Sequence, residues 1–320
     1  MDVVPEKQAL KVRQVHVGQE EAGQRIDNFL SRHLKGVPRS VIYRILRRGE
    51  VRVNSGRIRP AYRVKAGDTV RIPPLRIAPA RPDPLPGKWS AGIEDRILFE
   101  NSRLLVIDKP PGIAVHGGSG ISQGLIETLR VLRPAAPYLE LVHRLDRETS
   151  GCLIIAKRRS TLRALHEQLR GGLMVKRYQA LVRGRWVDGS RSVRAALKKN
   201  RLQGGERVVR VAEDGRVAET LFRPVTVYAV ASLLDIELKT GRTHQIRVHA
   251  AHIDFPLAGD GKYGDTEFNR VMKSFGLRRL FLHAHMLEFT DPGNAEPVVV
   301  SAPLGEELKQ VLDRLDEQSQ

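Results

Sequence analysis

The sequence is organised around residues 141–151, LVHRLDRETSG. Apolar runs precede and follow this stretch, LELV at 139–142 and CLIIA at 152–156, so we predict a buried strand on each side of it. The letters TSG at 149–151 are typical of a tight turn, because short hydroxyl side chains bond to nearby backbone and glycine accepts a positive φ. The stretch is therefore predicted to be a polar loop between two buried strands, a place where rigid scaffolds often carry chemistry.

One carboxylate, Asp146, lies in this loop between Arg144 and Arg147. Next to cationic groups it is expected to stay ionised at neutral pH, and an ionised, positioned carboxylate can act as a covalent nucleophile or a general base. The same three residues could instead form a structural ion pair that stabilises the turn. Spacing alone does not decide between these two interpretations.

Composition restricts the class of protein. The chain has 320 residues, of which 41% are hydrophobic, so we expect one or two packed domains rather than a disordered polycation. Its 54 Lys and Arg residues against 36 Asp and Glu residues leave a net charge of +18, which favours nucleic acid as the partner over an anionic membrane surface. The single cysteine, Cys152, excludes a disulfide framework and a thiolate metal cluster. With no signal peptide and no segment long enough to span a bilayer, the protein is expected to be cytoplasmic.

Residues 25–76 concentrate the positive charge, with 14 basic side chains and three acidic ones, a net charge of +11 (14 minus 3). A solvated basic face normally interleaves acidic residues for solubility, and this one barely does. Arginine binds phosphate oxygens through its planar, bidentate guanidinium group. We therefore predict a phosphate-contacting surface whose contacts include Arg39, Arg44, Arg47, Arg48 and Arg52.

The same region has the pattern of two short helices followed by short strands. Apolar residues recur at helical spacing in 25–34 and in 40–49, where the first residue, a serine, can cap the second helix. Residues 51–58 read as a strand, a turn at 55–56 and a return strand, and residues 69–72 as a further strand.

Over about residues 20–75 this stretch resembles the S4 RNA-binding domain, which implies a pair of helices on a small sheet that docks on structured RNA. The resemblance is carried, in order, by RIDNFL (25–30), VIYRILRRG (41–49), VRVN (51–54) and AGDTV (66–70).

A proline-rich stretch, residues 76–92, is predicted to be a semi-rigid linker to a second domain. That domain, residues 93–306, opens with two short strands at 97–100 and 104–109 and is followed by a C-terminal helix at 307–320. Its strands outnumber its helices and do not alternate regularly with them. We therefore predict an α+β protein, in which a small S4-type helix-pair domain precedes a larger, mixed, mainly antiparallel sheet.

Three common chemistries are not supported by the sequence. The glycine-rich segment 115–120 has neither the spacing nor the Lys-Ser/Thr pair of a phosphate-binding P-loop. Ser150 lacks the GxSxG elbow of a serine hydrolase. Five histidines do not have metal-ligand spacing and are expected to be hydrogen-bonded core or RNA-facing residues: His244, His249, His252, His283 and His285.

Five motifs occur in order along the second domain: DKPPG (108–112), HRLDRETSG (143–151), KRY (176–178), GRTHQIRVH (241–249) and DGKYG (260–264). By themselves, the residues of the fourth motif begin with a turn and continue as a strand edge or the first turn of a helix. Together, over about residues 95–305, the motifs resemble the pseudouridine synthases of the RluA/RluC type. The resemblance implies an isomerase that converts specific uridines of large-subunit (23S) ribosomal RNA to pseudouridine, without a cofactor or metal, and we expect it to be a monomer.

The resemblance also implies residue roles. Asp146 is the expected nucleophile, paired with Arg247, and whether it attacks the sugar or starts an elimination is left open. An extruded base needs an aromatic side chain to stack on and a group that fills the gap in the RNA. Tyr178 is expected to pack on the base and to assist removal of the proton from C5, Ile246 to line the pocket, and Arg144 to fill the vacated stack.

Two other functions stay open at this point. In a non-enzymatic ribosome-assembly protein both domains would only bind RNA, and Asp146 would be a structural ion-pair partner. A nucleoside hydrolase or glycosidase would require a second catalytic carboxylate, and Glu148 is the only one near in the sequence.

Overall fold

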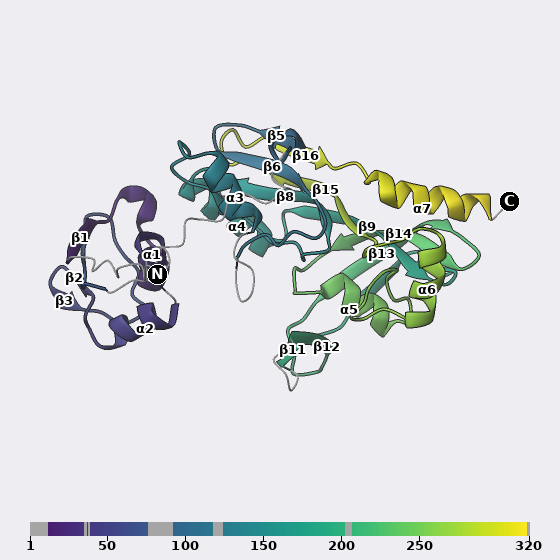
Figure 1. Cartoon of the computed structure of the whole chain (residues 1–320), viewed down its shortest axis with the longest axis horizontal. Helices are drawn as coiled ribbons and strands as arrows, with labels where there is room; N and C mark the ends of the chain where they lie inside the picture. Colours follow the sequence, from purple (N-terminus) through teal and green to yellow (C-terminus); the bar gives the residue numbers. More distant parts are fainter. Residues whose placement is uncertain are drawn as a thin grey trace, which may run out of the picture. The chain divides into compact units, whose positions relative to one another are not determined.

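The structure is a computed structural model in which the chain divides into two compact units, Met1–Gly87 and Lys88–Gln320 (Figure 1). It describes residues 12–34, 37, 39–75, 92–117, 124–201 and 207–318. Each unit has its own hydrophobic core. The predicted linker lies outside the described residues except for its last residue, Gly92, and half of the glycine-rich segment also lies outside them.

The first unit consists of a helix pair and a small sheet. Its elements are β1 (Arg13–His16), the 3-10 turn η1 (Gln19–Glu21), α1 (Ile26–His33), α2 (Arg39–Arg47), β2 (Arg52–Val53), β3 (Gly56–Arg57) and β4 (Thr69–Ile72). The sheet is antiparallel, with the strand order β1-β4-β2-β3. Apolar residues spaced three or four apart on the helices, including Phe29, Leu30, Ile42 and Ile45, are at most 1% exposed and form the core. The helix-pair and sheet prediction is confirmed.

The turn between β2 and β3 lies one residue earlier than predicted. Asn54 and Ser55 have the positive φ values, 48° and 65°, and Gly56 already belongs to β3. The Asn54 side chain donates to Asp68 Oδ1 at 2.9 Å and accepts the Thr69 N–H at 2.8 Å, which fixes the turn. Asparagine tolerates the left-handed conformation that a two-residue hairpin turn requires, so the turn does not need the glycine.

The arginines expected to contact phosphate lie mostly at the surface of this unit. Arg44, Arg47 and Arg48 are exposed, and their spacing of three and four places them on one side of α2 and its end. Arg52 is half-buried. The side chains of Arg39 and of the predicted helix cap, Ser40, lie outside the described part of the structure.

The second unit is built on a large mixed sheet. Its elements are η3 (Glu94–Arg96), β5 (Ile97–Glu100), β6 (Leu104–Lys109), α3 (Leu125–Leu132), β7 (Glu140–Leu141), β8 (Ser150–Ala156), α4 (Arg159–Gly171), β9 (Val175–Arg183), β10 (Arg191–Arg194), β11 (Leu197–Arg201), β12 (Arg207–Val211), β13 (Glu219–Val227), β14 (Ala231–Leu238), α5 (Gln245–His252), α6 (Thr266–Ser274), β15 (Leu282–Thr290), β16 (Pro297–Ser301) and α7 (Glu306–Glu317). The main strand order is β10-β13-β14-β9-β15-β8-β6-β5, with β16 beside β15 and β7 beside β8.

Strand pairing in this sheet is antiparallel except between β15 and β8, which are parallel. A separate hairpin, β11 with β12, projects from it (Figure 1). The predicted α+β fold with a mixed, mainly antiparallel sheet is therefore confirmed.

Helices cover both faces of the large sheet. On one face Leu105 and Leu153 share a core with residues of α3 and α5. On the opposite face Leu104 and Ile154 pack with α4, and Leu181 packs with α6 and α7. All seven residues of β8 are buried, as expected of a strand covered on both sides. Among the described helices, none has the length and apolar character needed to cross a membrane.

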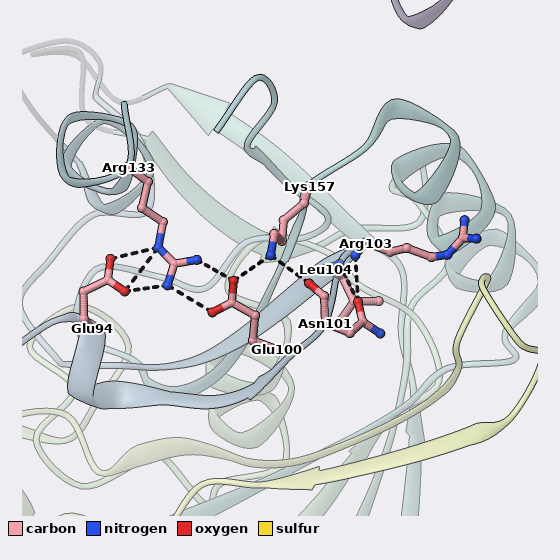
Figure 2. Close-up of polar contacts among 7 residues, drawn as sticks. All are labelled: Glu94, Glu100, Asn101, Arg103, Leu104, Arg133 and Lys157. Carbon is pink, nitrogen blue, oxygen red and sulfur yellow. Dashed lines mark hydrogen bonds and ion pairs between the residues drawn. The ribbon is translucent and has the colours of Figure 1, made fainter. Parts of the chain in front are cut away.

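A network of ion pairs joins the end of α3 to the outer strands (Figure 2). Arg133 pairs with Glu94 and with Glu100, each at 2.5 Å. Lys157, directly after β8, pairs with Glu100 at 2.7 Å and donates to the carbonyl of Asn101 at 2.7 Å. The hydrogen bonds from Arg133 lower the pKa of Glu100 from 4.5 to about 2 against the effect of burial, and Lys157 adds to this shift. The network therefore stabilises the fold most when Glu100 is ionised.

We predict that Glu100→Gln lowers the free energy of unfolding by about 1–2 kcal/mol at neutral pH, since it removes the charge shared by two cations while solvent screens part of the effect. The pKa of Glu100 is lower in the folded state, so its contribution is present above the ordinary pKa and is lost as the pH falls from about 4.5 towards 2. Urea unfolding at pH 7 and pH 3.5 measures both effects. Glu288→Gln, at an exposed position of β15, is the matched control, and an equal loss in both variants would contradict the prediction.

Candidate active site

The loop that carries Asp146 differs from the prediction in the position of its turn. The turn is formed by Arg147 and Glu148, and the Thr149 N–H donates to the Asp146 carbonyl at 3.1 Å. The predicted turn residues 150–151 instead begin β8. The residue types at 149–151 are typical of a turn, but a contact with another strand determines the conformation of this segment.

That contact is the close approach of β15 to the start of β8. Gly151 has a φ of +108°, and a Cβ atom added to it would lie 2.3 Å from the Ala284 carbonyl oxygen. Ser150 Oγ lies 2.9 Å from His283 Nδ1 and accepts a hydrogen bond from Arg279 at 3.2 Å. Gly151 is therefore required by the neighbouring strand, and the polar contacts of Ser150 fix the end of the loop.

Lys109 fixes the middle of the loop. Its side chain is fully buried, and its ammonium group donates to the carbonyls of Pro110 at 2.8 Å, Ile113 at 3.0 Å and Arg147 at 3.1 Å. The Gly112 N–H also donates to the Arg147 carbonyl, at 2.9 Å. Burial lowers the pKa of Lys109 to about 7. The motif at 108–112 thus holds the backbone beside Asp146.

His143 fixes the beginning of the loop. Its Nε2 accepts the Ile154 N–H at 3.2 Å, so the ring is assigned as the neutral form with its proton on Nδ1. Burial lowers the pKa of His143 to about 4, which agrees with a neutral ring. The neighbouring Arg144 side chain is exposed.

Two basic side chains lie beside Asp146. Arg247 Nη1 is 3.4 Å from Asp146 Oδ2, and His244 Nε2 is 3.7 Å from the same oxygen. Arg247 was expected beside Asp146, whereas His244 was expected to be a hydrogen-bonded core or RNA-facing residue. Burial lowers the pKa of His244 more than the Asp146 charge raises it, so the ring is neutral at neutral pH.

Asp260 holds Arg247 in this position. Its carboxylate accepts two hydrogen bonds from the guanidinium, at 2.7 and 2.8 Å, and also the N–H groups of Lys262 and Tyr263. Asp260 is 2% exposed, and although burial raises its pKa, the hydrogen bond and charge of Arg247 lower it overall. The guanidinium also lies 5.0 Å from the centre of the Tyr263 ring. The DGKYG motif therefore holds the Arg247 side chain in position, a role that could not be predicted from the sequence.

Tyr263 also orients His244. Its hydroxyl accepts the Val209 N–H at 3.0 Å and lies 2.8 Å from His244 Nδ1. Since Tyr263 accepts from Val209, we assign its proton to the bond with His244 Nδ1, so the single N–H of the neutral ring is on Nε2, facing Asp146.

The motif at 241–249 forms the start of helix α5 rather than a strand edge. Gln245 anchors it, because its side chain accepts from Thr240 and Arg242 and donates to Thr220 and to the Glu219 carbonyl. One helical turn later His249 also contacts Thr220, at 2.9 Å. These contacts bury the Gln245–His249 side of the helix against β13.

Residues from four distant parts of the chain line one pocket with a volume of about 670 Å³. Tyr178, on β9, is 6% exposed, and Ile246, on α5, is 4% exposed. Burial, and then the Asp146 charge, raise the pKa of Tyr178, so its phenol is protonated at neutral pH. The structure brings together all five residues predicted for this site: Arg144, Asp146, Tyr178, Ile246 and Arg247.

Other polar groups considered from the sequence have structural contacts. His283 bonds to Ser150 and to the Ala302 carbonyl, and His285 lies 2.9 Å from Asp235. Glu148 is exposed and does not line the pocket. Within the described ranges, no group of three or more His, Cys, Asp or Glu side chains could hold a metal ion.

Comparison with known proteins adds the following findings. A family model described as RNA pseudouridylate synthase matches residues 103–252, and one described as S4 domain matches residues 24–70. The chain is 53% identical over 309 residues to "Ribosomal large subunit pseudouridine synthase C" of Pasteurella multocida (strain Pm70), covering 96% of this chain and 95% of that protein. Identity to the protein of the same name from Escherichia coli (strain K12) is 54% over 308 residues, covering 95% and 97%. The solved structure "Human RNA Pseudouridylate Synthase Domain Containing 4" is 26% identical, covers 71% of this chain and 95% of that chain, and has a TM-score of 0.58.

We predict that Asp260→Asn lowers the free energy of unfolding by about 2–4 kcal/mol, because it leaves the buried Arg247 charge without its main counter-charge. Asp254→Asn makes the same chemical change at an exposed position with a φ of 67°, where asparagine is well tolerated. Urea unfolding of both variants at neutral pH measures the difference. Equal stabilities of the two variants would show that Asp260 does not compensate Arg247.

Proposed function

The chain belongs to the RNA pseudouridylate synthase family, and we propose that the RNA it modifies is large-subunit (23S) ribosomal RNA. It is an enzyme that isomerises uridine to pseudouridine. Its relatives at 53% and 54% identity are named for this activity on the large ribosomal subunit, and the chain spans nearly their whole length. We place it in the cytoplasm and expect a monomer, which light scattering after gel filtration would test.

The observation that carries the assignment of residues is the shared pocket of Asp146, Tyr178, Ile246, Arg247 and Arg144. The reaction breaks the C1′–N1 bond and joins C1′ to C5, while C5 loses a proton and N1 gains one. Because the product has the same atoms as the substrate, the reaction needs no oxidant, reductant or group donor. We assign Asp146 as the nucleophile. Arg247, held in position by Asp260, is the counter-charge of Asp146.

The other pocket residues would hold the base. Tyr178 offers an aromatic face, and its raised pKa supports a packing role, since a base for C5 would need the phenolate form. Ile246 supplies an apolar wall. Arg144 is exposed next to Asp146 and can enter the gap that a flipped uridine leaves in the RNA.

We also propose a division of labour along the chain. Residues 20–75 would bind ribosomal RNA through the arginines of α2, and residues 93–306 would carry out the isomerisation. Residues 76–92 would serve as the linker, and residues 307–320 as a C-terminal helix. The exposure of Arg44, Arg47 and Arg48 on one side of α2 supports the RNA-binding role.

Asp146→Asn is expected to reduce pseudouridine formation by at least about 1,000-fold, since the amide keeps the size of the side chain but is no nucleophile. The measurement is carbodiimide-blocked primer extension on ribosomal RNA from a strain that lacks the enzyme, incubated with each protein. Glu148→Gln, exposed in the same loop, should retain wild-type modification. Modification by Asp146→Asn at the wild-type rate would refute the nucleophile, and a folded, RNA-binding, inactive variant would exclude a purely structural Asp146.

Replacing Arg44, Arg47 and Arg48 together with Gln is expected to flatten the salt dependence of ribosomal RNA binding. Each phosphate contact contributes about 0.7–0.9 to the slope of log K against log salt concentration, so the slope should fall by about 2–3. A filter-binding titration between 50 and 300 mM KCl measures it. The control replaces three exposed cations of the catalytic unit, Arg270, Arg278 and Lys309, with Gln, and an equal change of slope in both triple variants would contradict the proposed surface.

A further inference from the structure

Lys176 is a buried cation in the pocket wall for which the catalytic assignment has no use. It is 7% exposed, and the described part of the structure gives its ammonium group no hydrogen bond or ion pair. Lys109, the other buried lysine near the loop, has three carbonyl acceptors for the same group. The stem of Lys176 is buried while its ammonium group opens onto the pocket, so among the described residues it is a cation without a protein acceptor that a ligand can reach.

The surroundings of Lys176 within the protein do not supply a negative charge. Burial lowers the pKa of Lys176, and no carboxylate opposes this effect. The Lys176 charge also lowers the pKa of His143, whose ring is already neutral because it is buried. A ligand that enters the pocket can therefore supply a negative charge that the protein does not place there.

The position of Lys176 relates it to the site of the base. It precedes Tyr178 by two residues on β9, so both side chains leave the sheet on the same face and line the same pocket. Two other cations of the pocket have carboxylate partners, Asp260 for Arg247 and Glu237 for Lys239. Lys176 is thus an available cation directly beside the residue that would hold the uracil ring.

We propose that Lys176 binds a phosphate group of the RNA backbone next to the nucleotide that is isomerised. This inference rests on the proposed function and deepens it, because it makes a phosphodiester, and not only a uracil base, part of what the pocket recognises. A phosphate carries the full negative charge that the buried ammonium lacks, whereas a base carbonyl carries only a partial one. Lysine is a common point-charge ligand of phosphate.

The test compares Lys176→Met with Lys309→Met, which removes the same charge from an exposed position of α7. Both are made in the Asp146→Asn protein, so that binding is measured without turnover, and the RNA is a ribosomal fragment containing a mapped target uridine. Lys176→Met should lower the slope of log K against log KCl by about 0.7–0.9, the value of one phosphate contact, and Lys309→Met should leave it unchanged. Lys176→Met should also have a melting temperature no lower than that of its parent, because methionine keeps the buried stem and removes the unpaired charge.

A second arm identifies the group that is bound. Oligonucleotides with one methylphosphonate, either 5′ or 3′ of the target uridine, neutralise a single phosphate. One of them should bind the parent protein about 5- to 10-fold more weakly, the cost of about one charged contact, and should bind Lys176→Met as well as the unmodified RNA does. Equal losses in both proteins for both oligonucleotides, or an unchanged slope for Lys176→Met, would overturn the proposal. Failure of the wild-type protein to modify ribosomal RNA would instead refute the proposed function, since the binding readout does not depend on turnover.

Discussion

The guanidinium group of Arg247 joins two carboxylates, Asp146 and Asp260, that lie far apart in the sequence. Only about an eighth of its side chain is exposed, so its charge has to be compensated within the protein. Asp260 supplies that compensation through two short hydrogen bonds, and the longer contact, 3.4 Å, is directed to Asp146. The arrangement leaves one carboxylate as a support and the other available to a substrate.

The fold fixes the position of Asp146 independently of this charge pair. Lys109 holds the backbone carbonyl of the next residue, His143 satisfies a strand N–H at the start of the loop, and Gly151 allows β15 to approach its end. Groups that must be placed accurately for catalysis are commonly held in this way by packing and hydrogen bonds of their neighbours. The backbone of the Asp146 loop is therefore held at both ends and in its middle, while the side chain of Arg144 is exposed.

Much of the site could be predicted because its residues lie in short motifs with specific chemistry. Asp146, Tyr178 and Arg247 were predicted together, and the structure places them in one pocket. What the sequence could not show depends on contacts between distant segments. The predicted turn was misplaced because the close approach of Ala284 is what requires a glycine at position 151. The start of α5 could not be decided because it depends on the hydrogen bond between Gln245 and Thr220. The role of Asp260 becomes visible only when Arg247 lies against it. The proximity of His244 to Asp146 was not predicted, because only the fold brings its Nε2 towards that carboxylate.

We propose that Asp260 acts on the reaction through Arg247. The most direct test of this proposal is a double-mutant cycle on the single-turnover rate of tritium release from ribosomal RNA labelled at uridine C5. Asp260→Asn and Arg247→Lys should each slow release, and the double variant should be about as slow as Arg247→Lys alone, because the support has no function without the group that it holds. If the rate of the double variant were lowered by the product of the two single effects, Asp260 would act independently of Arg247.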